Sequence, residues 1–195
     1  MGQHKLRDYL GEISLSNLPD PVIHNKLLKS IRDYMIVGGM PSVVEIYQQN
    51  NRYLEAQRRQ AVIVNTMRDD FSKYAKHANT ALLKLIIDKL PEIGCHRFKY
   101  TDISKETKSR DIKVAIEQLQ SARIMNRIFY TNASGIPLPK DTHDHRYKLL
   151  FLDIGLFQKL SGTMIDTLLS EDIIHLNKGV LAEQFVGQEM IAYSD

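Results

Sequence analysis

The fold is decided by residues 109–130, which read Ser109-Arg-Asp-Ile-Lys-Val-Ala-Ile-Glu-Gln-Leu-Gln-Ser-Ala-Arg-Ile-Met-Asn-Arg-Ile-Phe-Tyr130. In the first part, apolar side chains recur at the spacing of one helix face: Ile112, Ala115, Ile116, Leu119 and Ala122. The second part, Ile124–Tyr130, is rich in β-branched and aromatic residues, which favour a strand. The sequence therefore predicts an amphipathic helix over residues 109–122 that leads directly into a strand.

The segments on both sides of this stretch extend the pattern to a recognisable unit. Downstream, a turn-rich loop at Ala133–Pro139 precedes a second strand-like run at Arg146–Leu152, so the two strands can form a hairpin. Upstream, a helix is expected over residues 80–90 and a short helix over Tyr100–Lys105. Three helices closed by a hairpin are the layout of a winged helix-turn-helix, which we assign to residues 79–153.

Outside that unit the chain is expected to be helical. Apolar spacing and the positions of Pro and Gly predict helices over Pro21–Val37, Val43–Gln49, Arg52–His77, residues 156–161, residues 163–169 and Val180–Ala192. We group residues 1–78 as a helical linker region and residues 154–195 as a third region. The predicted fold class is mainly α (α+β), with one β-hairpin.

Composition excludes several classes of protein. The chain has 195 residues, of which 43% are hydrophobic and 25% charged, as is ordinary for a globular protein. No apolar run approaches the roughly 18–20 residues that span a bilayer, so no membrane contact is expected. A single cysteine, Cys95, excludes an internal disulfide and a multi-cysteine metal site. These features predict a cytoplasmic location.

Charge is concentrated in the predicted winged-helix unit. Between Arg97 and Arg127 there are eight basic and four acidic residues, whereas the whole chain has a formal net charge of only +3. A recognition helix presents its N-terminal residues to the major groove of DNA, and basic side chains there suit phosphate contact. The predicted DNA-binding residues are Lys108, Arg110, Lys113, Arg123 and Arg127. Glu117 would oppose phosphate, and because many winged helices dock proteins, DNA contact and domain docking both remain open.

Motifs for catalysis and cofactors are missing from the sequence. There is no Walker A loop, no dinucleotide-binding glycine motif and no nucleophile elbow. His143 and His145 would lie on one side of an extended strand, but a metal would need a further ligand, and none is evident. We therefore expect no catalytic residue, no metal and no cofactor.

Four blocks in order resemble a family of bacterial and archaeal AAA-type P-loop ATPases that carry a C-terminal domain of unknown function. The first, Arg32-Asp-Tyr-Met-Ile-Val-Gly-Gly-Met-Pro-Ser-Val-Val44, resembles that family's signature around "GG-[LFM]-P". The others are Met67–Tyr74, which resembles "r-D-[ilf]-x-k-y", Lys148–Leu156, which resembles "K-x-y-f-x-D-x-G-L", and Gly179–Glu189, which resembles "G-x-x-x-E-n-x-V-x-x-E-L".

The resemblance implies a longer protein, because full members begin with a P-loop ATPase and continue into a restriction-endonuclease-like domain. It places Glu183 and Glu189 on the first helix of that nuclease-like fold, so residues 154–195 would be its truncated start. The family's nuclease motifs further on are absent, so we expect no ATP or DNA hydrolysis. The implied partner is a separate or missing P-loop ATPase domain.

Two alternatives stay open beside this non-catalytic DNA-binding or docking fragment. One is a residual metal-dependent nuclease or ATPase-associated activity, which rests on the family and on Glu183. The other is a structural helical scaffold or the remnant of a split gene. In that case the apolar residues of the last helix, Leu181, Phe185, Val186 and Met190, would favour oligomers.

Overall fold

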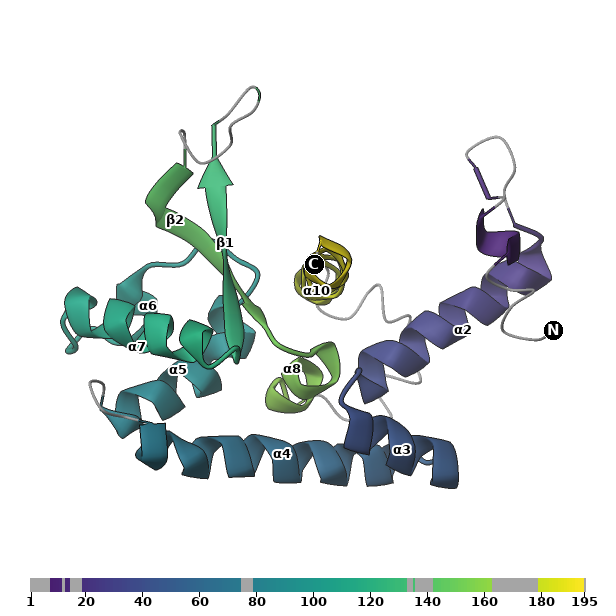
Figure 1. Cartoon of the computed structure of the whole chain (residues 1–195), viewed down its shortest axis with the longest axis horizontal. Helices are drawn as coiled ribbons and strands as arrows, with labels where there is room; N and C mark the ends of the chain where they lie inside the picture. Colours follow the sequence, from purple (N-terminus) through teal and green to yellow (C-terminus); the bar gives the residue numbers. More distant parts are fainter. Residues whose placement is uncertain are drawn as a thin grey trace. The chain divides into compact units, whose positions relative to one another are not determined.

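A computed structural model of the chain describes residues 8–11, 13–14, 19–74, 79–132, 135, 142–162 and 179–194. Contacts within the chain divide it into two compact units, Met1–Tyr34 and Met35–Asp195. The elements of the second unit are shown in Figure 1. The fold is mainly helical with one two-stranded antiparallel sheet, as the sequence predicts.

The longest element that begins in the first unit is the helix α2, Pro21–Val37, whose bounds match the prediction. Its start follows from local chemistry. The Asp20 side chain accepts a hydrogen bond from the backbone N–H of Val22 at 2.8 Å, and Pro21 occupies the first helical position, where no N–H is needed. The last three residues of α2 are buried and belong to the second unit.

The second unit contains seven further helices and one hairpin among its described residues. They are α3 (Pro41–Asn50), α4 (Tyr53–Tyr74), α5 (Thr80–Ile93), α6 (Tyr100–Ile103), α7 (Ser109–Ser121), β1 (Met125–Thr131), β2 (Thr142–Phe151), α8 (Ile154–Leu160) and α10 (Val180–Ser194). The order α5, α6, α7, β1, β2 is the order predicted for residues 79–153. Figure 1 shows the hairpin rising from the α5–α7 group, with α10 on its other side.

Several predicted element boundaries differ from those in the structure. The first upstream helix was expected to end at Leu90, before Pro91, but α5 continues to Ile93 with Pro91 inside it. The missing N–H of Pro91 falls in the last turn, Ile93 is buried, and the Gly94 N–H donates to the Leu90 carbonyl at 2.7 Å, which closes the helix.

The second strand starts at Thr142 rather than at Arg146, because Thr131 of β1 pairs with Thr142 beyond an irregularity in the ladder. The helix predicted over residues 156–161 is α8, which begins two residues earlier because the Asp153 carboxylate caps it. The helix predicted over residues 163–169 lies outside the described residues.

One large hydrophobic core joins α4, α5, α7, the hairpin, α8 and α10. Four of the five residues on the predicted inner face of α7 are buried, namely Ile112, Ala115, Ile116 and Leu119, whereas Ala122 follows the end of the helix and is exposed. The same core includes Phe71 from α4 and Leu156 from α8, which lie before residue 79 and after residue 153. The proposed three-part division at these residues stays a prediction.

The two faces of the hairpin are directed toward different parts of the protein. In the antiparallel register Met125 pairs with Phe151, Arg127 with Leu149, and Phe129 with Tyr147. Since side chains alternate along a strand, these pairs share the face that packs toward the core. Leu150 and Lys148 lie on the opposite face, toward α10.

No helix among the described residues is long and apolar enough to span a lipid bilayer.

Candidate nucleic-acid interface

The N-terminal end of α7 carries the cations predicted to contact DNA. Lys108 occupies the N-cap position with its backbone extended, and its side chain makes no capping hydrogen bond. Lys108 and Arg110 are both exposed, and neither has an ion pair within the part of the chain that the structure describes. Exposed cations at the N-terminal end of a helix form a suitable site for phosphate, although Asp111 in the same turn offsets part of the charge.

Glu117 forms ion pairs with two of the other predicted cations, Lys113 and Arg127. Its carboxylate lies 4.0 Å from the Lys113 Nζ and 3.4 Å from an Arg127 guanidinium nitrogen. The pair with Lys113 spans one helical turn of α7, whereas Arg127 reaches across from β1. The structure therefore brings Lys113 and Arg127 together, but around an acid that lowers the positive potential between them.

Arg127 is also packed rather than free at the surface. Its side chain is 17% exposed, its guanidinium lies 5.2 Å from the Phe129 ring centroid and 5.6 Å from that of Tyr147, and its Nε donates to the Gln120 amide oxygen. These contacts resemble those of a buried arginine that holds a strand against a helix. Arg127 therefore joins β1 to α7, and phosphate contact by its side chain would need this packing to change.

Arg123 sits at the turn between α7 and β1. Its φ of 57° is in the left-handed region, which ends the helix and turns the chain into the strand. The side chain is exposed and has no ion pair within the described ranges. Lys108, Arg110 and Arg123 are thus the three predicted cations that are exposed and outside the Glu117 ion pairs, at the two ends of α7.

A second basic cluster was missed by the sequence reasoning. Arg97, Lys99 and Arg146 line a depression of about 850 Å³. Arg97 and Lys99 precede α6, and Arg146 lies on β2, so only the folded hairpin brings them together. The sequence indicates this cluster only through Arg97 and Lys99, which belong to the basic stretch between Arg97 and Arg127.

Two tyrosines form the wall of this depression. The hydroxyls of Tyr100 and Tyr147 are 2.9 Å apart and share a hydrogen bond. Burial, and then the hydrogen bond with Tyr100, raise the pKa of Tyr147 well above its ordinary value, so this hydroxyl stays protonated at neutral pH. The Asp102 carboxylate accepts from the Lys99 backbone N–H at 2.7 Å and caps α6. These groups can bind an anion, but they offer no activated nucleophile.

The two carboxylates expected on a nuclease-like helix do not converge. Glu183 forms an ion pair with the Lys148 ammonium, and both side chains are almost half exposed. Glu189 is half-buried and lies six residues further along α10, so the two side chains leave the helix in different directions. Within the described ranges, no three His, Cys, Asp or Glu side chains are placed to hold a metal ion. The side chains of His143 and His145 lie outside those ranges.

The four sequence blocks that resemble AAA-type ATPases contact one another within residues 35–195. The Gly39 N–H donates to Asp153 at 2.7 Å, which joins the first and third blocks. Lys148 pairs with Glu183, and the Gln184 amide bonds both backbone groups of Phe151, which joins the third and fourth. The second block contributes Phe71 to the shared core.

A family model described as a domain of unknown function, DUF8612, matches residues 28–179. The matched region contains α3 to α8 and the greater part of α2. No curated protein and no solved structure matches the chain.

Proposed function

The chain belongs to the DUF8612 family of domains of unknown function, and we propose that it acts as a non-catalytic winged-helix module that binds DNA through α7. The observation that carries this proposal is the trio of accessible cations, Lys108, Arg110 and Arg123, at the two ends of α7. The thirteen residues of α7 cover about 20 Å at 1.5 Å per residue, so cations at both ends can reach phosphates on both sides of a groove.

The buried contacts of α7 support this role for the helix. Its apolar face is fixed in the core by four buried side chains, and the hairpin packs beside it through the Arg127–Glu117 ion pair. A recognition helix needs such a rigid base, because its outward face must keep a fixed position on the duplex.

We further propose that the module is part of an AAA-type ATPase system, with a P-loop ATPase domain as its partner. The resemblance of the four sequence blocks to that family supports this proposal, and the blocks contact one another within residues 35–195. The test is co-purification of the chain with a P-loop ATPase encoded by a neighbouring gene. Absence of such a gene and of any co-purifying ATPase would contradict the proposal.

The DNA test is a titration of a dye-labelled duplex of about 20 base pairs, followed by fluorescence anisotropy at several salt concentrations. Three phosphate contacts predict a slope of log K against log salt near −2.7, since each contact contributes about 0.9. The double variant Lys108→Ala/Arg110→Ala should reduce this slope to about −0.9.

Arg58→Ala is the control, because Arg58 is an exposed cation on α4, far from α7 in sequence, where it pairs with Glu55. It should leave the salt slope unchanged. No binding at micromolar protein in low salt would contradict DNA binding and favour domain docking. Equal losses from the control and the α7 variants would contradict binding through α7.

A further inference from the structure

An apolar groove of about 1080 Å³ lies between the outward face of the hairpin and α10. Its walls are Ile128 and Tyr130 of β1 and Val186, Met190 and Ile191 of α10. Met190 is 66% exposed, Tyr130 52% and Val186 50%. So much exposed apolar surface in one groove is typical of an interaction site.

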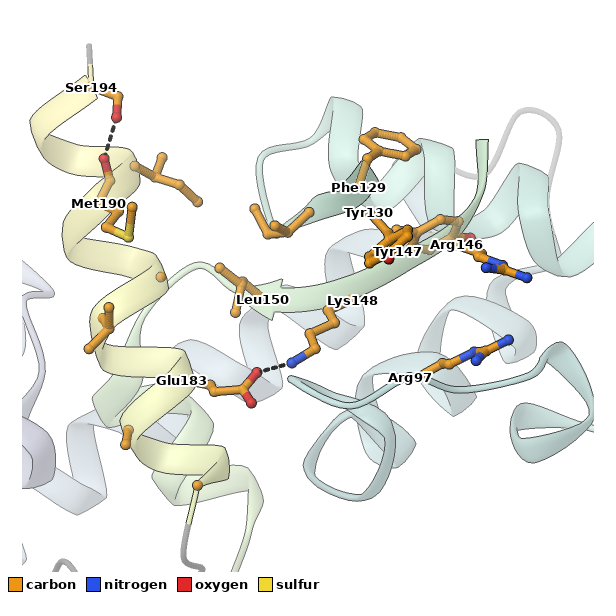
Figure 2. A pocket seen from close by; sticks show the side chains of 16 residues that line it. Arg97, Phe129, Tyr130, Arg146, Tyr147, Lys148, Leu150, Glu183, Met190 and Ser194 are labelled. Atoms are coloured by element: carbon orange, nitrogen blue, oxygen red, sulfur yellow. Dashed lines mark hydrogen bonds and ion pairs between the residues drawn. The ribbon is translucent and has the colours of Figure 1, made fainter. Parts of the chain in front are cut away.

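The groove follows from the way α10 is attached to β2. The side-chain amide of Gln184 accepts a hydrogen bond from the Phe151 N–H at 2.9 Å and donates to the Phe151 carbonyl at 2.8 Å. Three residues later, Gly187 lies so close to Leu150 that a Cβ atom at position 187 would collide with its methyl groups. From this contact β2 and α10 diverge, as Figure 2 shows, and the space between them is the groove.

Charge is distributed unevenly around this groove. Its basic lining residues are Arg97, Arg146 and Lys148, and its one acidic lining residue among those described, Glu183, is already paired with Lys148. Figure 2 shows Arg97 and Arg146 at the end away from α10, whereas Met190 lies along the helix. The groove is therefore apolar beside α10 and positively charged at its far end.

We propose that this groove binds a protein segment of matching chemistry: an acidic amphipathic helix. Its apolar side chains would cover Val186, Met190 and Ile128, and its carboxylates would reach Arg97 and Arg146. Binding of a short amphipathic helix in an apolar groove is a common mode of peptide recognition, and the charged end would fix its direction.

The shape and chemistry of the groove favour a peptide over other ligands. The walls are half exposed, and the volume lies at the upper end of the range of small-molecule pockets, about 300–1,000 Å³. Nucleic acid would satisfy Arg97 and Arg146 but would leave the aliphatic wall of α10 without a counterpart. This site is separate from the cations of α7, so it adds a protein contact to the proposed DNA contact and does not depend on it.

The test uses the full 195-residue chain and three dye-labelled model helices of 18 residues. The first has Leu on one face and Glu on the other, the second has Lys in place of Glu, and the third is a scrambled form of the first. We expect the Glu helix to bind at least about tenfold more tightly than the Lys or scrambled helix.

Variants locate the binding in the groove. Met190→Glu places a charge on the apolar wall, and Arg146→Glu reverses the charge at the far end; each should weaken binding of the Glu helix at least about tenfold. Tyr193→Glu is the matched control, because Tyr193 is 87% exposed on the same helix and does not line the groove. Circular dichroism is used to check that each variant is folded.

Several outcomes would overturn the proposal. One is an absence of binding by the Glu helix at concentrations that reveal a Kd of about 1 mM. A second is equal binding of the Lys helix, or binding that Met190→Glu leaves unchanged. A third is a monomer–dimer equilibrium in sedimentation that Met190→Glu abolishes, which would assign the groove to a second copy of the chain. Loss of duplex binding by Met190→Glu alone would assign it to DNA.

Discussion

The carboxylate of Asp153 fills the space beside Gly38 that a larger side chain would need. A Cβ atom at position 38 would lie 2.7 Å from one carboxylate oxygen of Asp153 and even closer to the other. The same carboxylate accepts hydrogen bonds from the Gly39 N–H at 2.7 Å and the Leu156 N–H at 2.8 Å. One buried acid thus joins the end of α2 to the start of α8.

Gly38→Ala should therefore destabilise the protein strongly. The backbone at Gly38 has a φ of 75°, which an L-residue adopts with strain, and the new methyl group would displace the Asp153 carboxylate. We expect a loss of about 2–4 kcal/mol in the free energy of unfolding, measured by urea denaturation.

Gly162→Ala separates the effect of backbone strain from the effect of the collision with Asp153. Gly162 has a similar φ of 69°, but a Cβ atom added at this position would meet no atom of the described residues within 4 Å, so the substitution carries backbone strain without a collision among them. Its loss should stay near about 1 kcal/mol. Equal losses at positions 38 and 162 would show that the Asp153 carboxylate does not fill the space beside Gly38.

Asp153 also gives the fold a predictable dependence on pH. Burial raises the pKa of its carboxyl above the ordinary value of 3.8, and three backbone N–H groups oppose that shift only in part. The folded state then binds this proton more tightly than the unfolded state does. The contribution of Asp153 to stability should be greatest at pH values below 3.8 and should fall as the pH rises through the raised pKa.

The measurement compares urea unfolding of the wild type and Asp153→Asn between about pH 3 and pH 7, a range that brackets ordinary carboxyl titration. An amide does not titrate, so the stability of the wild type relative to Asp153→Asn should be greatest at low pH and should fall as the pH rises. Asp153→Asn should also lower stability by about 1–3 kcal/mol at acidic pH, because the NH2 group of the amide can only donate, whereas both oxygens of a protonated carboxyl can still accept a hydrogen bond from a backbone N–H. A difference that is constant with pH would contradict the raised pKa.

Glu117 is predicted to weaken the proposed DNA contact. Glu117→Gln removes the acid between Lys113 and Arg127 and leaves their charges available. We expect a salt slope that is steeper by up to about 1 and an affinity at low salt that rises several-fold. Glu92→Gln is the control, because it removes an acid that pairs with Lys89 on α5. A rise of the same size in the control would mean that only net charge matters.

Most of the fold can be predicted from local sequence patterns, because the apolar residues that repeat at helical or strand spacing are the ones that become buried. The inner face of α7 repeats at helical spacing, and the order of helices and hairpin follows from it. The face of β1 on which Arg127 lies can be predicted from the alternation of side chains along a strand, and this face is not the one that a DNA contact needs. Met125, Arg127 and Phe129 alternate along one strand, so Arg127 shares its face with two apolar residues and turns toward the core.

The groove and the second basic cluster could not be predicted in the same way. Arg97 and Arg146 are far apart in the sequence, and only the paired hairpin brings them together. The apolar face of α10 was recognised, but its residues divide in the structure: Leu181 is buried in the core, whereas Val186 and Met190 are exposed. That division depends on the close contact at Gly187, which no local pattern reveals.

The attachment of α10 can be tested at Gln184. This side chain is fully buried, and Gln184→Ala would leave the N–H and the carbonyl of Phe151 without partners. Unpaired buried backbone groups are expensive, so we expect a loss of about 2–4 kcal/mol in unfolding free energy and faster amide hydrogen exchange throughout α10. Gln49→Ala on α3, whose side chain bonds Glu45 at an exposed site, should lose less than about 0.5 kcal/mol. Unchanged exchange in α10 would mean that apolar packing, and not this pair of hydrogen bonds, holds α10 against β2.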